Sequence, residues 1–222
     1  MMFKDRREAG RRLAETLRPF VAQPDLLVLG LPRGGIPVAY EVARALNAPL
    51  DVFVVRKLGV PGHEELAMGA IATGGVRILN RETIRQLRIP PEAVERVTLA
   101  EQRELERRER AYRGARPVPD VQGRTVIVVD DGLATGASMS AAIAALRQQH
   151  PARIVVAAPV AAAETCEALR EMADVCVCMQ TPQPFHGVGQ WYADFGQTTD
   201  AEVSALLNEA AQRYVAGAAT HE

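Results

Sequence analysis

Apolar and polar positions form blocks along the chain that predict strands and helices in turn. Continuous apolar runs predict strands at 26–31, 51–57, 125–129, 153–159 and 174–178. Apolar residues at helical spacing predict helices at 3–17, 35–47, 136–149, 161–172 and 199–216. Strands that alternate with helices and are apolar throughout indicate an α/β fold. We therefore expect a central, mostly parallel sheet flanked by helices on both faces.

The middle of the chain departs from this alternation. Residues 67–72 and 76–79 predict short extended segments, and helical patterning then continues through 80–113. Residues 101–113 are almost all charged, which is typical of a helix that faces solvent or a partner. The strand–helix pattern then resumes. We expect one domain over 1–222 with a helical insertion at 76–120, whose candidate roles are a dimer contact and part of an acceptor site.

Composition narrows the class of protein without naming a function. The chain has 222 residues, 48% apolar and 24% charged, and a formal net charge of −1, which gives no general attraction to nucleic acid or acidic membranes. No apolar run approaches the ~20 residues of a membrane span, and the charged first residues do not resemble a signal peptide. Cys166, Cys176 and Cys178 are odd in number and lack metal-ligand spacing. We expect reduced cysteines, no disulfide framework and a cytoplasmic location.

Two adjacent acids follow the predicted strand at 125–129. Asp130 and Asp131 lie where ligands bind in open parallel sheets, outside the carboxyl ends of the strands. Ribose hydroxyls or a divalent cation would relieve the repulsion between two carboxylates there. The small residues after them open a helix, and its backbone N–H groups with the hydroxyls of Thr135 and Ser138 suit a phosphate. The pattern predicts a sugar phosphate site.

Other interpretations of this stretch fit less well. A nucleotide-triphosphatase loop needs G-x-x-x-x-G-K-[ST], and the lysine is absent. A dinucleotide fingerprint needs G-x-G-x-x-G, which Gly132 and Gly136 do not provide. A phospho-accepting receiver domain would carry its acidic pair near the N-terminus. The plain alternative is that Asp131 caps a helix and Thr-Gly forms a turn.

The segment VIVVDDGLATGAS, residues 126–138, resembles the phosphoribosyl-pyrophosphate (PRPP) signature of the type I phosphoribosyltransferases. The resemblance implies that Asp130 and Asp131 hold the ribose hydroxyls and Mg²⁺. It also implies that the following loop seats the 5-phosphate, through Ala134, Thr135, Gly136, Ala137 and Ser138. The sequence departs from the usual signature at Gly132, where an aliphatic residue is common, and at Ala137-Ser138, where Gly-Thr is frequent.

Two further loops match the family in order and type. Arg33, Gly34 and Gly35 follow the strand at 26–31, and the resemblance implies a pyrophosphate loop there, often with a strained or cis peptide. Arg56 and Lys57 end the strand at 51–57, and a flexible loop with His63 and Glu64 follows. The resemblance implies that these four residues act at the reacting centre as the loop closes. The plain alternatives are an ordinary turn with a surface arginine, and a solvated Arg-Lys with an exposed loop.

A hood at 180–198 would complete the site by binding the acceptor. Aromatic residues are scarce in the chain, yet Phe185, Trp191, Tyr192 and Phe195 gather in this segment, where a flat ring could stack. We expect Phe185, Trp191 and Tyr192 to bind the acceptor. Core packing is the competing explanation for each of them. Ala134 stands where oxopurine-salvage relatives carry an aspartate, which argues against that acceptor.

The resemblance implies a Mg²⁺-dependent phosphoribosyltransferase that acts on PRPP and a nitrogenous base or similar small acceptor and releases pyrophosphate. Its expected partner is a second copy of the chain, as a homodimer, with no nucleic acid or membrane partner. The alternative is a catalytically silent regulator that binds PRPP or a nucleotide on the same fold. A hydrolase or phosphatase on this fold is the third possibility.

Overall fold

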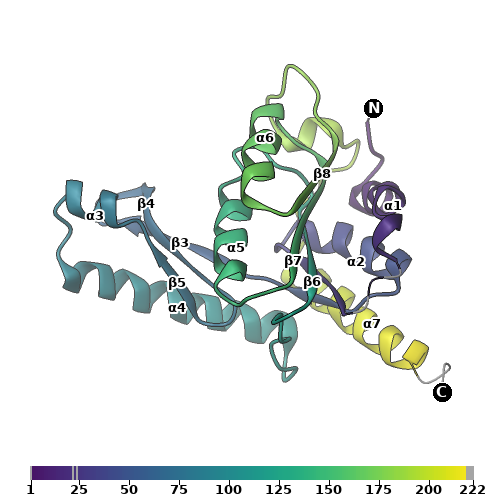
Figure 1. Cartoon of the computed structure of the whole chain (residues 1–222), viewed down its shortest axis with the longest axis horizontal. Coiled ribbons are helices and arrows are strands. Elements are labelled where there is room, and N and C mark those ends of the chain that lie inside the picture. Colours follow the sequence, from purple (N-terminus) through teal and green to yellow (C-terminus); the bar gives the residue numbers. More distant parts are fainter. Residues whose placement is uncertain (1, 22, 24, 219–222) are drawn as a thin grey trace.

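The computed structural model describes residues 2–21, 23 and 25–218, which form a parallel sheet covered by helices, with a projecting arm (Figure 1). Five parallel strands make the central sheet in the order β2-β1-β6-β7-β8. Their bounds are Leu50–Val52, Leu26–Gly30, Thr125–Val129, Arg153–Val160 and Val175–Gln180. The predicted α/β class and central parallel sheet are confirmed.

Side chains of each central strand alternate between two buried cores, one on each face of the sheet. Val28, Ile127 and Val155 belong to the first core, which includes residues of α1 (Arg6–Thr16), α2 (Gly35–Leu46) and α7 (Asp200–Ala218). Their neighbours Leu27, Val126 and Ile154 belong to the second, with residues of α5 (Ala137–Arg147) and α6 (Ala163–Met172). Because both faces are buried, the strands are apolar throughout rather than alternating.

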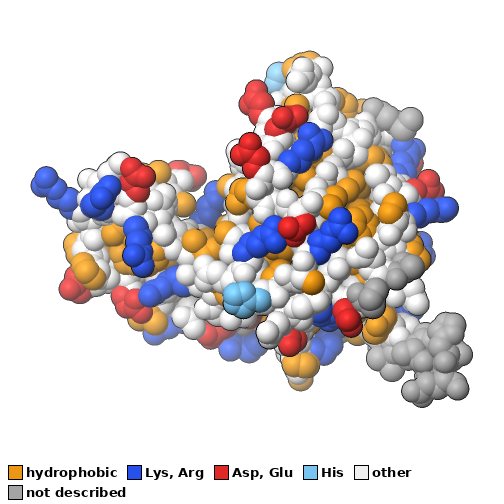
Figure 2. All heavy atoms as spheres, in the orientation of Figure 1, with side chains coloured by type: hydrophobic (Ala, Val, Ile, Leu, Met, Phe, Trp, Pro, Cys, Tyr) orange, Lys and Arg blue, Asp and Glu red, His pale blue; other side chains and the backbone are white. Residues whose placement is uncertain are grey.

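The arm, residues 55–113, leaves the central sheet and forms a layer of its own. Its antiparallel sheet contains β3 (Val55–Val60), β4 (His63–Ala72) and β5 (Val76–Leu79). Two helices, α3 (Arg81–Gln86) and α4 (Pro91–Arg113), complete it. Figure 1 shows the arm projecting from the body, and Figure 2 shows side chains of both charges on its surface.

A buried ion pair joins the arm to the body. Arg113, at the end of α4, is 3% exposed, and its Nε lies 3.0 Å from Asp51 Oδ2 in β2. Its Nη2 donates to the carbonyl of Val52 at 3.0 Å. Burial raises the pKa of Asp51, and the guanidinium opposes that effect. The long charged helix therefore ends with an arginine inside the body, although most of its surface faces solvent.

Three expectations for this region were wrong in detail. The single strand expected at 51–57 is two, because the chain leaves the parallel sheet after Val52 and enters the arm at Val55. The segment expected to be a flexible loop is a hairpin, since β4 already begins at His63 and pairs antiparallel with β3. The helical block at 80–113 is two helices, and Pro90, which has extended backbone, caps the second.

The hood at 180–198 packs against the N-terminal residues. Phe3 N donates to the carbonyl of Trp191 at 2.7 Å, and Ala193 N donates to the carbonyl of Phe3 at 2.8 Å. A short 3₁₀ helix, η2 (Val188–Trp191), forms part of the hood, and another, η1 (Arg18–Phe20), follows α1. The hood is therefore held by residues far from it in sequence.

The cysteines contradict the expectation of a fully reduced chain. Cys166 of α6 and Cys178 of β8 form a disulfide, and Cys176 remains a free thiol. The odd number of cysteines argued against a disulfide framework, but an odd number still allows one bonded pair. That pair forms because α6 packs on β8 and brings together residues that are 12 apart in sequence. No helix in the described ranges is both long enough and apolar enough to cross a membrane.

Candidate functional site

The acidic pair lies at the carboxyl end of β6, the middle strand of the sheet. The loop behind it is anchored at Leu133, which is 2% exposed and bonds to the end of β7 through its backbone N–H, 3.0 Å from the carbonyl of Val160. Ala134 and Thr135 are exposed beyond this anchor, as is Ser138 in the first turn of α5. Gly136 has a φ of +68° and precedes α5, a conformation that glycine adopts without strain. The loop therefore presents a helix N-terminus to solvent beside two carboxyl groups.

The glycine loop after β1 packs directly on that pair. Residues of β1 and β6 are in register, and the amide of Leu31 donates to the carbonyl of Val129 at 2.9 Å. A Cβ at Gly34 would overlap the carboxylate of Asp131. One at Gly35 would lie 2.7 Å from the Val129 carbonyl and 3.1 Å from Asp130 Oδ1. Only glycine lets the two loops approach so closely. The Pro32–Arg33 peptide is cis, as the resemblance implied.

Arg6 of α1 neutralises part of the acidic pair. Its Nε lies 2.7 Å from Asp131 Oδ2, and the two side chains are 13% and 14% exposed. Its Nη1 donates to the carbonyl of Gly196 at 2.7 Å, and its guanidinium carbon lies 4.0 Å from the ring centre of Phe195. Arg6 thus links the first helix, the acidic pair and the hood.

Burial controls the proton affinity of both carboxyl groups. It raises the pKa of Asp130 well above 3.8, and the adjacent charge of Asp131 raises it further. Burial also raises the pKa of Asp131, while Arg6 opposes the shift. The backbone N–H of Asp131 donates to Asp130 Oδ1 at 2.9 Å. The pair therefore holds a proton more readily than two exposed aspartates, and a cation or hydroxyl donors would favour its charged form.

The residues predicted to act at the reacting centre lie on the arm. Arg56, Lys57 and Glu64 line a cavity of about 460 Å³ with Ser138, so the arm and the start of α5 share one hollow. Arg56 Nε donates to Glu101 Oε2 of α4 at 2.6 Å. His63 is exposed at the start of β4 and does not line this cavity. Asp130 and Asp131 do not line it either.

The Arg33 side chain reaches toward the start of α7. Its Nη1 lies 3.8 Å from Asp200 Oδ1, and the arginine side chain is 37% exposed. Asp200 also accepts a hydrogen bond of 2.9 Å from the hydroxyl of Tyr112. A pair this long and this exposed is weak, so Arg33 can leave it at little cost.

The hood aromatics differ in their surroundings. Tyr192 is 5% exposed, packs 5.4 Å from the ring of Phe3, and donates its hydroxyl to the Asp131 carbonyl at 2.5 Å. Burial raises its pKa. Phe185 and Trp191 are partly buried against the same small core. Tyr192 therefore supports the backbone of the acidic pair. Its burial is explained by core packing and not by contact with an acceptor.

The hood also accounts for an unusual residue of the signature. A Cβ at Gly132 would overlap the side chain of Val188 in η2. Glycine therefore stands at 132 because the hood occupies the space that an aliphatic side chain would fill. Sequence reasoning could not connect these residues, since they lie far apart in the chain.

Sequence reasoning missed Arg6 as part of the site, and it placed Phe195 only within the aromatic cluster of the hood. Arg6 lies 125 residues before Asp131 in a helix whose many arginines look alike. Phe195 packs with its ring centre 5.1 Å from that of Tyr192 and is 37% exposed. The aromatic cluster at 185–195 was the only available signal for Phe195.

The donor set suits magnesium. The acidic pair supplies carboxylate oxygens beside an anion-binding loop, and Mg²⁺ prefers oxygen ligands from one or two carboxylates with substrate phosphates. A second cavity of about 470 Å³ lies between β4, β5 and α4 and contains none of the predicted site residues.

Comparisons with known proteins agree with this geometry. Residues 6–194 match the family model described as the phosphoribosyl transferase domain. Two Mycobacterium tuberculosis proteins provisionally named phosphoribosyl transferases, Rv0571c and MT0597, are each 44% identical over 209 residues, 94% of this chain. Those residues cover 47% of each relative, so the chain spans about half their length.

A solved structure agrees along nearly its whole length. The crystal structure of TT1426 from Thermus thermophilus is 46% identical, covers 94% of this chain and 99% of its own, and superposes with a TM-score of 0.84. The family match, residues 6–194, covers all five strands of the central sheet, both loops at its ligand side and the arm. The chain therefore belongs to the phosphoribosyl transferase domain family.

Proposed function

We propose that this chain transfers the 5-phosphoribosyl group of PRPP to a nitrogenous base or similar small acceptor and releases pyrophosphate. One observation carries the proposal. The acidic pair and the small-residue loop that opens α5 lie beside the glycine loop after β1, and both loops end strands at the same edge of the sheet. A pentose with a phosphate at one end and a diphosphate at the other needs this arrangement.

Each loop would bind a different part of PRPP. Asp130 and Asp131 would accept hydrogen bonds from the ribose hydroxyls. The loop of Ala134, Thr135, Gly136, Ala137 and Ser138 would hold the 5-phosphate with backbone N–H groups and two hydroxyls. Arg33, Gly34 and Gly35 would hold the pyrophosphate, and Arg33 can reach it because its pairing with Asp200 is weak.

Catalysis would depend on position and charge rather than on a nucleophilic side chain. A nitrogen of the acceptor would attack the anomeric carbon with inversion as the bond to pyrophosphate breaks. Arg56 and Lys57 would stabilise the departing negative charge. His63 and Glu64 lie on the β3–β4 hairpin, and movement of that hairpin toward the body would exclude water from the reacting carbon.

Magnesium fits this proposal through the acidic pair. Asp130 and Asp131 would hold it, together with oxygens of the substrate. When bound, the cation supplies positive charge that offsets the phosphates. Arg6 occupies one carboxylate oxygen of Asp131 and would share or release it as the ligands arrive.

The acceptor and the assembly are parts of the same proposal. Phe185 and Trp191 are partly exposed in the hood and would stack on an acceptor ring, while Tyr192 would position the acidic pair. Phe195, the most exposed aromatic of the hood, already stacks with the guanidinium of Arg6. Ala134 leaves no aspartate for an oxopurine. A homodimer through the arm is supported by exposed leucines there, Leu66, Leu87 and Leu99, which are 47–48% exposed.

The pairing of Arg6 with Asp131 favours one alternative function. A carboxylate already neutralised inside the protein could serve a regulator that binds PRPP or a nucleotide without turnover. Such a regulator would bind PRPP or a nucleotide without releasing pyrophosphate.

The test measures pyrophosphate release with PRPP, Mg²⁺ and a panel of bases, alongside PRPP affinity by calorimetry. We expect release that depends on one class of base, and Asp131→Asn should abolish PRPP binding. Asp120→Asn is the matched control, because Asp120 is exposed in a loop after α4. Binding without release would support the regulator, release of phosphate without any base would indicate a hydrolase, and normal PRPP affinity in Asp131→Asn would refute the site.

A further inference from the structure

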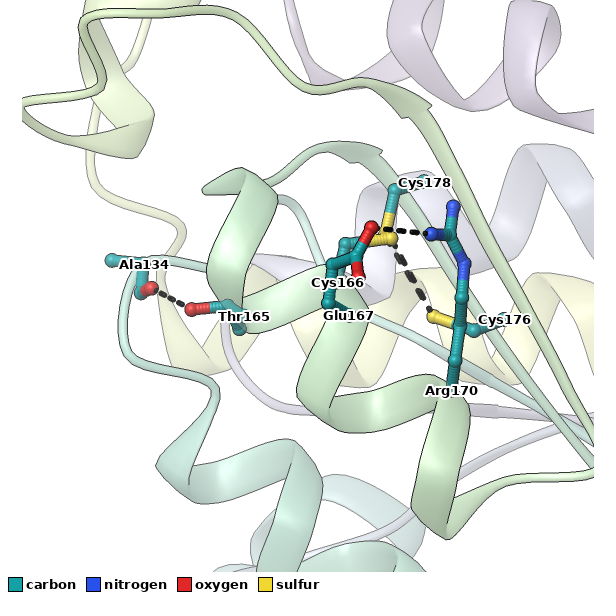
Figure 3. The surroundings of a disulfide bond; sticks show 7 residues. All are labelled: Ala134, Thr165, Cys166, Glu167, Arg170, Cys176 and Cys178. Carbon is teal, nitrogen blue, oxygen red and sulfur yellow. Dashed lines mark hydrogen bonds and ion pairs between the residues drawn. A yellow bond between two sulfur atoms is a disulfide. The ribbon is translucent and has the colours of Figure 1, made fainter.

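The three cysteines of the chain meet at one place outside the PRPP site. Cys166 lies on α6 and is 1% exposed, while Cys176 and Cys178 lie two residues apart on the edge strand β8, where their side chains share a face. Cys176 Sγ is 3.9 Å from Cys166 Sγ and 3.7 Å from Cys178 Sγ, and the other two sulfurs form the disulfide (Figure 3). One atom from each residue lies within 4.8 Å of the others.

These separations match a metal–thiolate site. Sulfur ligands about 2.3 Å from a tetrahedral zinc ion lie about 3.8 Å from one another. Two of the three sulfur pairs already have that spacing, although only the third pair is bonded. The Cα atoms of Cys166 and Cys178 are 6.4 Å apart, so reduction and rotation about the side-chain bonds can separate their sulfurs without moving α6 from β8.

Burial and a nearby arginine act in opposite directions on a site that would carry negative charge. Three thiolates and one divalent cation sum to −1. Burial raises the pKa of the Cys176 thiol, and the positive charge of Arg170 on α6 opposes that shift. Arg170 also pairs with Glu167 at 3.2 Å. Cys176 and Cys178 are partly exposed on the edge strand, which leaves solvent access for a fourth ligand.

We propose that Cys166, Cys176 and Cys178, when reduced, form a trithiolate site for a single thiophilic cation of the zinc class, with water as the fourth ligand. The disulfide is the oxidised, metal-free form of this site. A dithiol reductant donates two electrons and two protons to the Cys166–Cys178 bond and becomes a disulfide, which yields two cysteine thiols. Zinc then replaces three thiol protons, giving a Zn(S-Cys)₃ centre of charge −1.

The position of the site gives it a structural role. Thr165, next to Cys166, donates its hydroxyl to the carbonyl of Ala134 at 2.5 Å (Figure 3). A metal at the three sulfurs would fix α6 against β8 and so fix the residue that supports this loop. The proposal does not depend on transferase activity.

The test uses the full chain, reduced with a dithiol and freed of metal, then titrated with Zn²⁺ against a chromophoric chelator and with Co²⁺ for its thiolate charge-transfer band. We expect one equivalent of metal per chain and a cobalt spectrum typical of tetrahedral thiolate ligation. The same protein oxidised to the Cys166–Cys178 disulfide retains one thiol and should bind neither ion at this site.

Cys176→Ser is the decisive variant, because it leaves the disulfide pair intact while removing one ligand. Loss of a residue that only supports a metal ligand lowers metal affinity about 10–100-fold, so loss of a ligand itself should lower it more than about 100-fold. His186→Ala removes an ordinary metal ligand from the exposed hood and should bind as the parent does.

Three results would overturn the proposal. They are equal affinity in Cys176→Ser and the parent, equal affinity in oxidised and reduced protein, and no metal in the reduced parent. Circular dichroism checks that Cys176→Ser is folded. If it is not, Cys178→Ala takes its place, and it must also lose the metal while retaining one equivalent of thiol at each of Cys166 and Cys176.

Discussion

The body of the molecule and its arm contribute to the candidate site in different ways. At the edge of the central sheet, Gly34, Asp131 and Arg6 are packed so closely that a single methyl group at 34 would overlap a carboxylate. On the arm, Lys57, His63 and Glu64 are exposed, and the cavity lined by the arm sheet and α4 includes one body residue, Ser138 of α5. The acidic pair and the glycine loop, which we propose bind PRPP, are fixed by packing, whereas three of the four residues proposed for the reacting centre are exposed.

Binding and chemistry can therefore be divided between two parts of one fold. Rigid loops at strand ends favour affinity, because a loop that is already ordered loses little conformational entropy when a ligand binds. The arm is tied to the body through α4, with Arg113 buried against Asp51, and through its three strands, which all pack on α5. Residues 61–66, at the turn of its β3–β4 hairpin, are exposed, and we propose that this turn approaches a bound ligand. We expect substitutions in the body to affect affinity and substitutions in the arm to affect turnover.

Outside the acidic pair itself, the largest expected effect comes from Gly34→Ala. Gly34 has φ −62° and ψ −31°, which alanine adopts readily, so only the added methyl matters. It would displace the carboxylate of Asp131 and the adjacent Arg6. We expect PRPP affinity to fall by more than about 100-fold, comparable to the loss of a buried charged contact. Gly187→Ala is the control, because nothing lies within 4 Å of its Cβ position. Equal affinities by calorimetry would contradict the proposed closeness of the two loops.

Arg6→Met tests whether the body depends on the internal counter-ion. The substitution leaves Asp131 buried without its partner, and breaking a buried pair in this way costs about 3 kcal/mol. Because Arg6 lowers the pKa of Asp131, its loss lets that carboxyl take up a proton, so destabilisation should be greater at pH 8 than at pH 5. Denaturant unfolding at both pH values measures this. Arg11→Met, at a residue 51% exposed, should change stability little, and a similar loss in both variants would rule out a special role for Arg6.

Gly132→Ala tests whether the hood packs against the loop at 130–138 through Gly132. The new methyl would overlap Val188, and overpacking of this kind costs about 1–3 kcal/mol. Adding Val188→Ala should restore much of the lost stability, because it removes the side chain that the methyl meets. Thermal unfolding of the single and double variants measures the coupling. If the two changes are additive, the hood does not rest on Gly132 as the structure indicates.

The sequence predicted most of the body because its information is local. Each central strand is an apolar run, and the acidic pair follows directly on one of them, so the site at 130–138 could be placed from a single stretch. The arm was harder, because a hairpin of short strands with Gly59, Pro61 and Gly62 has the composition of a loop. The antiparallel pairing of β3 with β4 shows that this segment is part of a sheet.

Contacts between distant residues could not be predicted from one chain. Arg6 resembles the other arginines of its helix until α1 packs beside the acidic pair. The same limit hid the thiol cluster, since Cys166 lacks metal-ligand spacing to Cys176 and Cys178 and meets them only because α6 lies on β8. Patterns of period and spacing report which elements form, whereas these sites depend on how the elements pack.

The smallest expected effect is the pH dependence of stability caused by Asp130, which lies in the body. Burial raises the pKa of Asp130 well above 3.8, so the folded chain holds a proton that the unfolded chain releases. Stability therefore falls as the pH rises from about 4 through the raised pKa, with a slope below about 1.4 kcal/mol per pH unit. Asp130→Asn removes this proton and should flatten the slope, while its amide oxygen can still accept from the N–H of Asp131. Melting temperatures between pH 4 and 8 measure the difference, with Asp120→Asn as the exposed control. If stability depends on pH as steeply in Asp130→Asn as in the parent, the acidic pair does not hold the extra proton. Both carboxyl groups would then be charged in the protein without a ligand.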